Sequence, residues 1–368
     1  MLTINLIREQ SSFVIERLKV KNFDATATVA LVLDLDRRRR ELQTESDSIQ
    51  AGLNSLSREI GAMMKEGRKA EAESARIGIG AMKDKQKQLA DTLEEVTGQM
   101  QAELVKLPNL PHQMVAPGKS AEDNVIVRSG GEIPQLHGGA VPHWDLIKKY
   151  DIIDFDLGIK ITGAGFPVYK GKGARLQRAL INFFLDEGGR AGYREIEPPI
   201  VVNEDSGFGT GQIPDKEGQM YHVGIDNLYM IPTAEVPITN IYRDVILDAA
   251  ELPVKNVGYT PCFRREAGSW GAHVRGLNRL HQFDKVEIVQ IAHPDKSYEA
   301  LEEMVKHVES LLAKLELPYR IVRLCGGDMS FTSAMTYDFE VWSAAQQRWL
   351  EVSSTSNFEA FQANRLRC

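Results

Sequence analysis

Several features that define other protein classes are scarce or absent in this chain. Only three cysteines occur among its 368 residues, Cys262, Cys325 and Cys368, and their spacing fits neither a disulfide framework nor a zinc site. No apolar run approaches the ~20 residues that a membrane-spanning helix needs. The first residues, MLTINLIREQ, lack the apolar core of a signal peptide. These absences predict a protein of the reduced cytoplasm with no membrane partner.

Two common nucleotide-binding motifs are also missing. No G-x-G-x-x-G follows a predicted strand and no Walker A lysine motif occurs, which disfavours the parallel nucleotide-binding folds. There is no global basic excess either, because 44 Lys and Arg stand against 51 Asp and Glu, a net charge of -7. Any contact with a nucleic acid must therefore come from local basic patches.

A heptad pattern fills much of the first hundred residues. Core positions recur every seven residues from about 29 to 64, the pattern breaks at 65–68, and it resumes between 79 and 107. This pattern predicts an antiparallel coiled-coil hairpin whose arms each extend roughly 50 Å. Prolines at 108, 111 and 117 end the second helix. We therefore expect one domain over 1–110 and a second over 111–368.

Two basic clusters lie on the predicted hairpin and could meet the phosphates of an RNA. Acidic residues are interspersed with both clusters, so a dimerisation rod or spacer fits the pattern as well. The clusters are Arg37, Arg38, Arg39 and Arg40 on the first helix, and Lys83, Lys85 and Lys87 on the second.

The remainder of the chain shows many strands with helices interposed irregularly, which predicts an α+β domain with an antiparallel sheet. Helices are expected over 174–188 and 297–315, the second capped by Ser297. The stretch from Tyr259 to Val289 alternates on both flanks around a Gly-containing polar segment, and this predicts a long hairpin.

The predicted hairpin carries an unusual set of side chains. Residues two apart on a strand share a face, so Arg264 is expected beside Glu266, and Phe283 beside Lys285 and Glu287. Arginines, carboxylates and one aromatic ring on a sheet suit a ligand that is phosphorylated and heteroaromatic. A purely structural hairpin with a solvated charged face fits the pattern equally well.

Four stretches, in this order, resemble the motifs of the seryl-tRNA synthetase family, within the class II aminoacyl-tRNA synthetases. They are GTGQIP at 209–214, IPTAEVP at 231–237, CFRREAG with HQFDKVE at 262–287, and EVSSTSNFEAFQANR at 351–365. The resemblance runs over the whole chain. It implies an enzyme that activates L-serine with ATP and Mg²⁺ to seryl-adenylate and transfers serine to tRNA(Ser), and also to tRNA(Sec).

The resemblance also implies roles for individual residues. Arg264 would bind the α-phosphate and the serine carboxylate, because a guanidinium can bridge two oxygens as a fork. Phe283 would stack on adenine, and Glu287 would help to hold the serine ammonium and hydroxyl. The implied sets are Arg264, Glu266 and Arg275 for catalysis; Thr233, Ala234, Glu235, Arg264 and Glu287 for serine; Arg264, Arg265, Glu266, Phe283, Glu351, Val352, Ser353 and Ser354 for ATP; and Glu351 and Ser354 for Mg²⁺.

Three further expectations follow from the resemblance. The hairpin would bind the long variable arm of tRNA, and the helix over 174–188 with the strand before Pro198 would form a homodimer interface, although a plain helix and edge strand fit those residues as well. The family's third motif, a Gly-rich strand and helix bearing an arginine for the γ-phosphate, is not found up to Cys368. We therefore expect a sheet with exposed apolar surface and an incomplete ATP site.

Two alternatives to a serine–tRNA ligase remain. One is a synthetase-like protein that loads an amino acid onto a carrier protein; such relatives usually lack the long hairpin. The other is a non-catalytic RNA-binding relative.

Overall fold

The computed structural model describes residues 1–215, 217–266 and 275–368. They divide into two compact units. The first comprises Met1–Lys19 and Phe23–Pro108, and the second comprises Val20–Asn22 and Asn109–Cys368.

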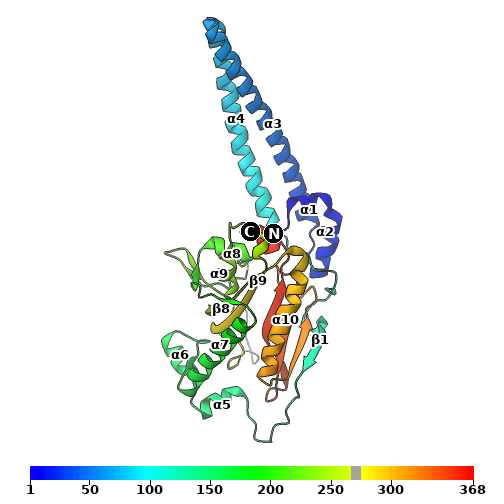
Figure 1. Cartoon of the computed structure of the whole chain (residues 1–368), viewed down its shortest axis with the longest axis vertical. Helices are drawn as coiled ribbons and strands as arrows, with labels where there is room; N and C mark the ends of the chain where they lie inside the picture. The colour runs from blue at the N-terminus through cyan, green and yellow to red at the C-terminus, as the bar shows by residue number, and fades with distance from the viewer. Residues whose placement is uncertain (216, 267–274) are drawn as a thin grey trace. The chain divides into compact units, whose positions relative to one another are not determined.

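The first unit is a helical hairpin preceded by two short helices. Its helices are α1 (Ile4–Glu9), α2 (Ser11–Leu18), α3 (Thr26–Lys65) and α4 (Lys69–Leu104). The two long helices lie side by side (Figure 1) and are joined at Gly67, whose φ of 79° is in the left-handed region that glycine tolerates. The predicted coiled-coil hairpin is confirmed.

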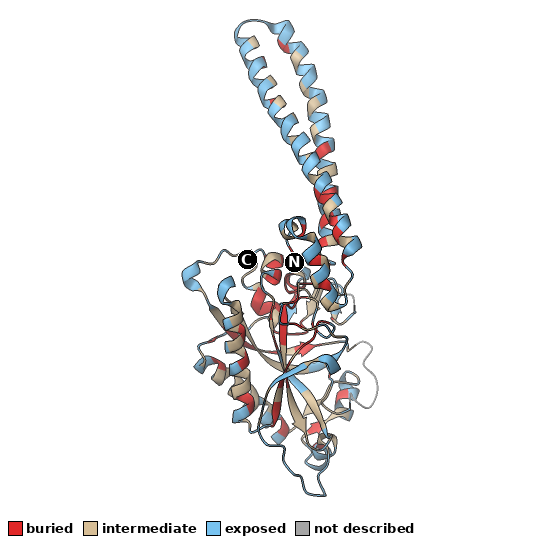
Figure 2. Cartoon of the chain, turned by 90° about the vertical axis from the view of Figure 1, so that its right-hand side faces the viewer, coloured by how far each residue is buried: buried red, intermediate tan, exposed pale blue. Residues whose placement is uncertain are grey.

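The second long helix begins well before the predicted residue 79. Its first turns, KAEAESARIG, lack the large apolar core residues, although the small Ala72 is buried, and they consist largely of strong helix formers, so they extend the helix. Most of the hairpin surface is exposed in Figure 2. Buried residues seven apart occur on both helices: Leu53 and Ile60 on α3, and Leu89 and Val96 on α4.

The second unit is α+β and mostly antiparallel. Its larger sheet has the order β1-β10-β11-β12, and a second has the order β4-β8-β9, in which β4 is parallel to β8. These strands are β1 (Val125–Gly130), β4 (Arg194–Glu195), β8 (Val254–Phe263), β9 (Gln282–Ile291), β10 (Tyr319–Arg323), β11 (Met335–Ser343) and β12 (Arg348–Asn357). Smaller pairings join β2 (Ile153–Asp154) to β3 (Val168–Tyr169), and β5 (Val201–Val202) to β7 (Leu228–Met230) and β6 (His222–Val223). The predicted α+β class and long β8–β9 hairpin are confirmed.

Seven α-helices accompany these strands in the described part of the second unit. They are α5 (His143–Lys149), α6 (Phe155–Ile161), α7 (Lys172–Arg190), α8 (Glu204–Thr210), α9 (Glu235–Asn240), α10 (Ser297–Lys314) and α11 (Phe361–Leu366). The prediction that Ser297 caps α10 is wrong. The short 3-10 turn Pro294–Lys296 leads directly into α10, so Lys296 is the N-cap and Ser297 the first helical residue.

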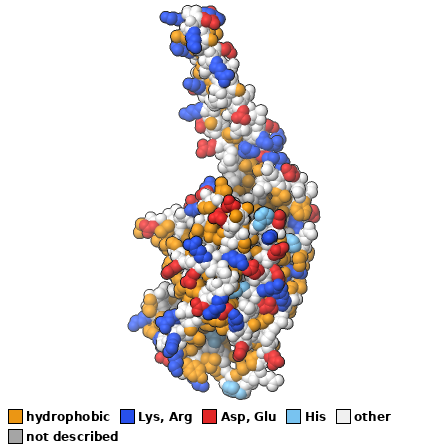
Figure 3. Space-filling model, viewed as in Figure 1, with side chains coloured by type: hydrophobic (Ala, Val, Ile, Leu, Met, Phe, Trp, Pro, Cys, Tyr) orange, Lys and Arg blue, Asp and Glu red, His pale blue; other side chains and the backbone are white. Residues whose placement is uncertain are grey.

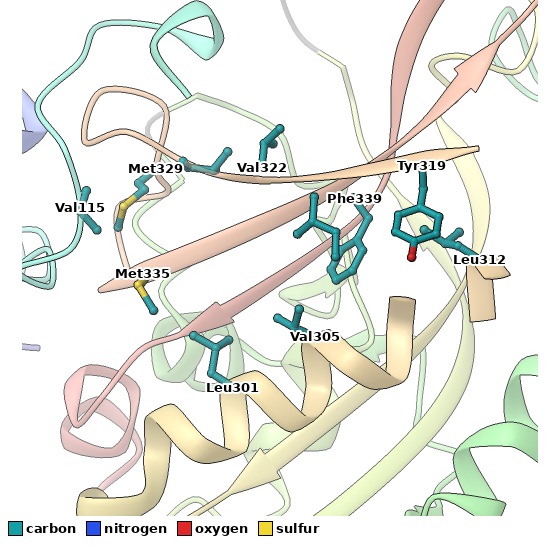
Figure 4. Close-up of a cluster of buried hydrophobic side chains, with 11 residues drawn as sticks. Val115, Leu301, Val305, Leu312, Tyr319, Val322, Met329, Met335 and Phe339 are labelled. Carbon is teal, nitrogen blue, oxygen red and sulfur yellow. The ribbon is translucent and has the colours of Figure 1, made fainter. Parts of the chain in front are cut away.

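The core of the larger sheet lies between its strands and α10 (Figure 4). Leu301 and Val305 of α10 pack in one cluster with Ile321 of β10 and Phe339 of β11, and Phe339 is fully buried. Each such side chain contributes about 1.5–3 kcal/mol of hydrophobic stabilisation when buried. Because this core anchors β11, the neighbouring β12 presents its side chains from a rigid sheet.

The β8–β9 hairpin differs from the prediction at the end where the two strands are connected. Phe263 pairs with Gln282 in the last step of the ladder, and β8 ends there. Glu266 has a φ of 48°, so strand alternation does not extend to it, and the predicted shared strand face for Arg264 and Glu266 is wrong. The predicted loop over 269–279 overlaps residues 267–274, which lie outside the described residues.

Candidate active site

One cavity of about 1120 Å³ in the second unit collects most of the predicted site residues. Its lining comes mainly from β9, α10, β12 and α11, together with the loop before α9 and the residue that follows β8. The predicted residues that line it are Thr233, Glu235, Arg264, Glu287, Glu351, Val352, Ser353 and Ser354. Ala234 is fully buried, and Ala234, Arg265, Glu266, Arg275 and Phe283 are not part of the lining.

Glu287 stands at the centre of a hydrogen-bonded group on β9. Its Oε2 accepts from the hydroxyl of Thr233 at 2.9 Å and pairs with the ammonium of Lys285 at 2.7 Å. The same ammonium donates to Thr233 Oγ1 at 3.1 Å. The predicted common face of Lys285 and Glu287 is therefore confirmed. The motif comparison did not assign Lys285 to the site, although the alternation placed it there.

Glu235 faces the same cavity from the first turn of α9. Gln362 of α11 donates to Glu235 Oε1 at 2.6 Å and also to the carbonyl of Thr210 at 3.1 Å. Burial and the nearby Glu287 carboxylate raise the pKa of Glu235 to about 7, against the opposing effects of Gln362, Lys285 and Arg264. Sequence reasoning missed Gln362 because its side chain is uncharged. Its position inside the matched motif at 351–365 was the available signal.

Arg264 lies just beyond the end of β8. Its Nε donates to the carbonyl of Pro232 at 3.3 Å, and its guanidinium carbon is 5.0 Å from the centroid of the Phe283 ring. Its two terminal nitrogens have no hydrogen-bond partner among the described residues. A guanidinium held by its Nε and by a ring presents its remaining fork to an anion in the cavity. Phe283 is half-buried and stands beside the cavity lining rather than in it.

Glu351 and Ser354 share a face of β12 because of a β-bulge. Ser353 pairs with Phe339, whereas Glu351 pairs with Glu340, so Val352 is an extra residue without a partner on β11. In a regular strand, residues three apart point to opposite faces. The extra residue, Val352, brings the side chains of Glu351 and Ser354 to the same face, as bulges do when they redirect a side chain.

The side chain of Asp338 on β11 lies on the same face of the sheet as Glu351 and Ser354. Asp338 pairs with Ser354 across the sheet. Burial and the carboxylate of Glu351 raise the pKa of Asp338 to about 7, and a hydrogen bond from Ser354 opposes this rise. Burial also raises the pKa of Glu351, while Arg264 and Arg279 lower it. The two arginines therefore offset part of the acidic charge on this wall of the cavity.

The remaining predicted residues lie around the end of the hairpin. Glu266 forms an ion pair with Arg279 at 2.7 Å, and the Glu266 side chain is only 12% exposed. Arg265 stands 5.9 Å from the centroid of the Tyr221 ring, and Arg275 stands 4.9 Å from that of Trp144. Sequence reasoning missed Arg279, whose nearness to the HQFDKVE motif was the available signal.

On the first unit, a single carboxylate organises the basic cluster of α3. Asp36 is 1% exposed and accepts from Arg8 at 3.0 and 3.1 Å, from Arg39 at 3.0 Å and from Arg40 at 3.1 Å. Burial raises the pKa of Asp36, but hydrogen bonds from Arg8 and Arg39 outweigh this and hold the pKa below its usual range. Figure 3 shows Lys and Arg side chains gathered over the part of α3 nearest α1.

The other predicted basic residues of the hairpin divide into paired and unpaired groups. Arg37 pairs with Asp34 at 2.5 Å, and Lys85 pairs with Glu45 at 2.7 Å. Arg38, Lys83 and Lys87 are exposed and have no ion-pair partner among the described residues. The basic cluster around Asp36 also includes Arg8, which donates to the Asp36 carboxylate. Sequence reasoning missed Arg8 because it is distant in sequence from Arg37–Arg40.

Residues 1–215, 217–266 and 275–368 contain neither a membrane-spanning helix nor a cluster of metal ligands. No helix there is long and apolar enough to cross a membrane. No group of three or more His, Cys, Asp or Glu side chains in the same ranges is arranged to hold a metal ion.

Comparisons with known proteins agree with the motifs. The seryl-tRNA synthetase N-terminal domain matches residues 1–111, and the class II core domain of the synthetases for G, H, P, S and T matches residues 221–368. The chain is 49% identical to a serine–tRNA ligase of Salinibacter ruber and 45% identical to one of Delftia acidovorans. These matches cover 99% and 100% of this chain, and 85% and 86% of the relatives.

A solved structure shows the same relationship. The seryl-tRNA synthetase of Pyrococcus horikoshii, crystallised with ATP, superimposes with a TM-score of 0.92 at 32% identity, over 100% of this chain and 86% of that one. Because residues 1–111 and 221–368 match the two domain families and relatives at 45–49% identity match nearly the whole chain, the chain belongs to the seryl-tRNA synthetase family.

Proposed function

We propose that the protein is a serine–tRNA ligase, which activates L-serine with ATP and transfers the serine to tRNA. The observation that carries this proposal is the single cavity shared by Arg264, Glu287 and Glu351. Arg264 offers a cation to the α-phosphate and the serine carboxylate, and Glu287 offers a carboxylate to the serine ammonium. Glu351 offers oxygen ligands for a cation bound to the phosphates of ATP. The match of the N-terminal domain over residues 1–111 counts against a carrier-loading paralogue, since such relatives usually lack the hairpin.

In the first step, a carboxylate oxygen of serine attacks the α-phosphorus of ATP. A new P–O bond forms, the bond to the β-phosphate bridging oxygen breaks, and pyrophosphate leaves. The two reacting groups, the serine carboxylate and the triphosphate, are both anionic, so the site must supply positive charge and in-line positioning rather than a nucleophile. The free fork of Arg264 can bind both groups, and Phe283, which packs against Arg264, is proposed to stack on adenine. In the second step, a terminal ribose hydroxyl of tRNA displaces AMP from the seryl carbonyl.

Mg²⁺ fits the oxygens on β12. The bulge directs Glu351 and Ser354 to one face in the cavity wall, and a carboxylate and a hydroxyl are ligands that Mg²⁺ accepts alongside phosphate oxygens and water. When bound, the ion would neutralise charge on the phosphates of ATP. Glu351 and Ser354 would hold it.

Selectivity for serine over alanine follows from the carboxylates of the cavity. A site built to bond a hydroxyl rejects the analogue that lacks it, because a polar group would be left unpaired. We assign the serine ammonium and hydroxyl to Glu287 and Glu235. The test is exchange of labelled pyrophosphate into ATP, expected with serine and at least about 100-fold slower with alanine or glycine. Equal exchange with alanine would refute the assignment of serine as substrate.

The hairpin is proposed to bind tRNA(Ser) through its phosphates, and tRNA(Sec) is proposed as a second acceptor. The cluster of Asp36 with Arg8, Arg39 and Arg40 has three guanidiniums and one carboxylate, a local excess of positive charge on a chain of net charge -7. Such contacts position a nucleic acid without reading its sequence. The cytoplasm, where tRNA is charged, is the proposed location.

A homodimer is proposed from α7. Although α7 has 19 residues, its only buried ones are Gly173 and Gly188. Leu176, Leu180 and Phe183 follow one another at the i, i+4, i+7 spacing of one helix face, and Leu176 is 57% exposed. An apolar stripe of this kind needs a partner surface.

We expect Leu176→Asp to convert a dimer into monomers in sedimentation equilibrium, because a carboxylate would be buried without a partner at the interface. Ile225→Asp is the matched control, since Ile225 is 99% exposed and should leave the mass unchanged. A wild-type chain that sediments as a monomer at micromolar concentration would contradict the proposal.

A further inference from the structure

The hydroxyl of Thr233 has no hydrogen-bonding capacity left for a substrate. A threonine hydroxyl can donate one hydrogen bond and accept two. Here it donates to Glu287 Oε2 at 2.9 Å and accepts from Lys285 Nζ at 3.1 Å and from the backbone N–H of Glu235 at 3.3 Å. Thr233 therefore acts through Glu287.

The two oxygens of Glu287 are used unequally. Both the Thr233 hydroxyl and the Lys285 ammonium bond to Oε2, at 2.9 and 2.7 Å. Oε1 has no hydrogen-bond partner in the described part of the chain, although Glu287 lines the cavity and its side chain is only 15% exposed. A carboxylate fixed through one oxygen presents the other in a defined direction.

We infer that Lys285 is a positioning residue for the amino-acid substrate: with Thr233, it fixes one oxygen of Glu287 and leaves the other to receive the substrate's amino group. The inference rests on the proposed activation of serine. Lys285 itself need not touch the substrate.

The charges around Lys285 support this role. Arg264 and Lys285 face the carboxylates of Glu235 and Glu287, so the inner end of the cavity is balanced and suits a zwitterion such as an amino acid. Burial lowers the pKa of Lys285, but the ion pair with Glu287 more than offsets this, so Lys285 stays charged. Burial raises the pKa of Cys262, the other titratable group on this face of β8, so its thiol adds no charge.

Without Lys285, the carboxylates of Glu235 and Glu287 would have the guanidinium of Arg264 as their nearby positive charge among the described residues. Because Glu287 raises the pKa of Glu235 and Lys285 lowers it, the pair would then retain a proton to a higher pH than in the wild type. A carboxyl that carries a proton binds an ammonium poorly. The loss of serine affinity should therefore be largest near pH 7 and should diminish as the pH rises and the pair ionises.

The test is Lys285→Gln in the full chain, followed by serine-dependent pyrophosphate exchange. We expect KM for serine to rise about 10- to 100-fold at pH 7, as for the loss of a charged hydrogen bond, with KM for ATP within about threefold of wild type. The pH at which KM for serine levels off should move upward, because Lys285 lowers the pKa of Glu235 in the wild type. Lys285→Arg should recover most of the affinity, because it restores the charge.

The matched control is Lys255→Gln. Lys255 is on the adjacent strand of the same hairpin and pairs with Glu303, away from the cavity lining. A Lys285→Gln variant with the KM and pH profile of this control would overturn the inference. So would an equal loss of both affinities and of kcat, and so would a failure of Lys285→Arg to recover serine affinity in a variant with wild-type circular dichroism. A wild-type chain without serine-dependent exchange would instead refute the proposed function.

Discussion

Replacement of Arg264 by alanine is expected to abolish serine-dependent exchange of pyrophosphate into ATP, with a loss of at least about 10³-fold. Among the described residues, Arg264 carries the only guanidinium of the cavity lining, and its free fork is the group placed to bind the α-phosphate and the serine carboxylate together. Both KM for serine and kcat should suffer, because the contact is made to both reacting groups.

Two variants sharpen this result. Arg264→Lys keeps the charge but not the fork, and we expect it to retain less than about 1% of activity because a single ammonium cannot bridge two anions in the same geometry. Arg190→Ala is the control: Arg190 is an exposed residue that pairs with Glu187 at 2.6 Å and is not part of the cavity lining. If Arg264→Ala exchanged pyrophosphate at more than a tenth of the wild-type rate, Arg264 would not be the phosphate ligand.

Deletion of residues 31–104, replaced by a short glycine linker, is expected to separate the two steps. All these residues belong to the first unit, whereas the cavity belongs entirely to the second. Exchange of pyrophosphate should therefore remain within about threefold of wild type. Charging of tRNA should fall by at least about 10³-fold, because the phosphate contacts of the hairpin supply much of the affinity for a nucleic acid.

The retained exchange activity serves as the internal control for folding of the second unit. A finer comparison pairs Arg38→Gln with Arg76→Gln. Arg38 has no ion-pair partner among the described residues, whereas Arg76 pairs with Glu73 at 3.2 Å near the turn. Only the first should raise KM for tRNA and reduce its salt dependence. If the deletion variant charged tRNA as fast as the wild type, the proposal that the hairpin binds tRNA would be refuted.

The sequence predicted the parts of this structure that depend on periodicity. Heptad spacing identified the hairpin of α3 and α4, and strand alternation placed Lys285 and Glu287 on one face, as observed. Both patterns succeed because the repeat of a regular element determines which side chains share a surface. The motif resemblance added which of these surfaces carries a ligand.

Irregular backbone could not be predicted in the same way. Nothing in the letters EVSS indicates a bulge, because Val352 suits a regular strand, yet the extra residue is what brings Glu351 and Ser354 to one face. The left-handed conformation of Glu266 is equally invisible in sequence. Such features arise from tertiary pairing, so they appear only when the neighbouring strand is known.

Long-range side-chain partners were the other gap. Gln362 reaches Glu235 across 127 positions of the chain, and Arg8 reaches Asp36 across 28. Each of these residues is ordinary in its local context. Their roles follow only from the three-dimensional packing that brings distant segments together.

The Asp36 cluster shows that the net charge of a surface is a poor measure of its attraction for phosphates. An acid is usually subtracted when a surface is scored for affinity toward polyanions. Here the acid gathers three like charges that would otherwise repel one another and spread, so it sharpens the local field while lowering the total. Formal charge and the capacity to attract a phosphate chain can therefore move in opposite directions, and an acidic protein can still present a strongly cationic spot.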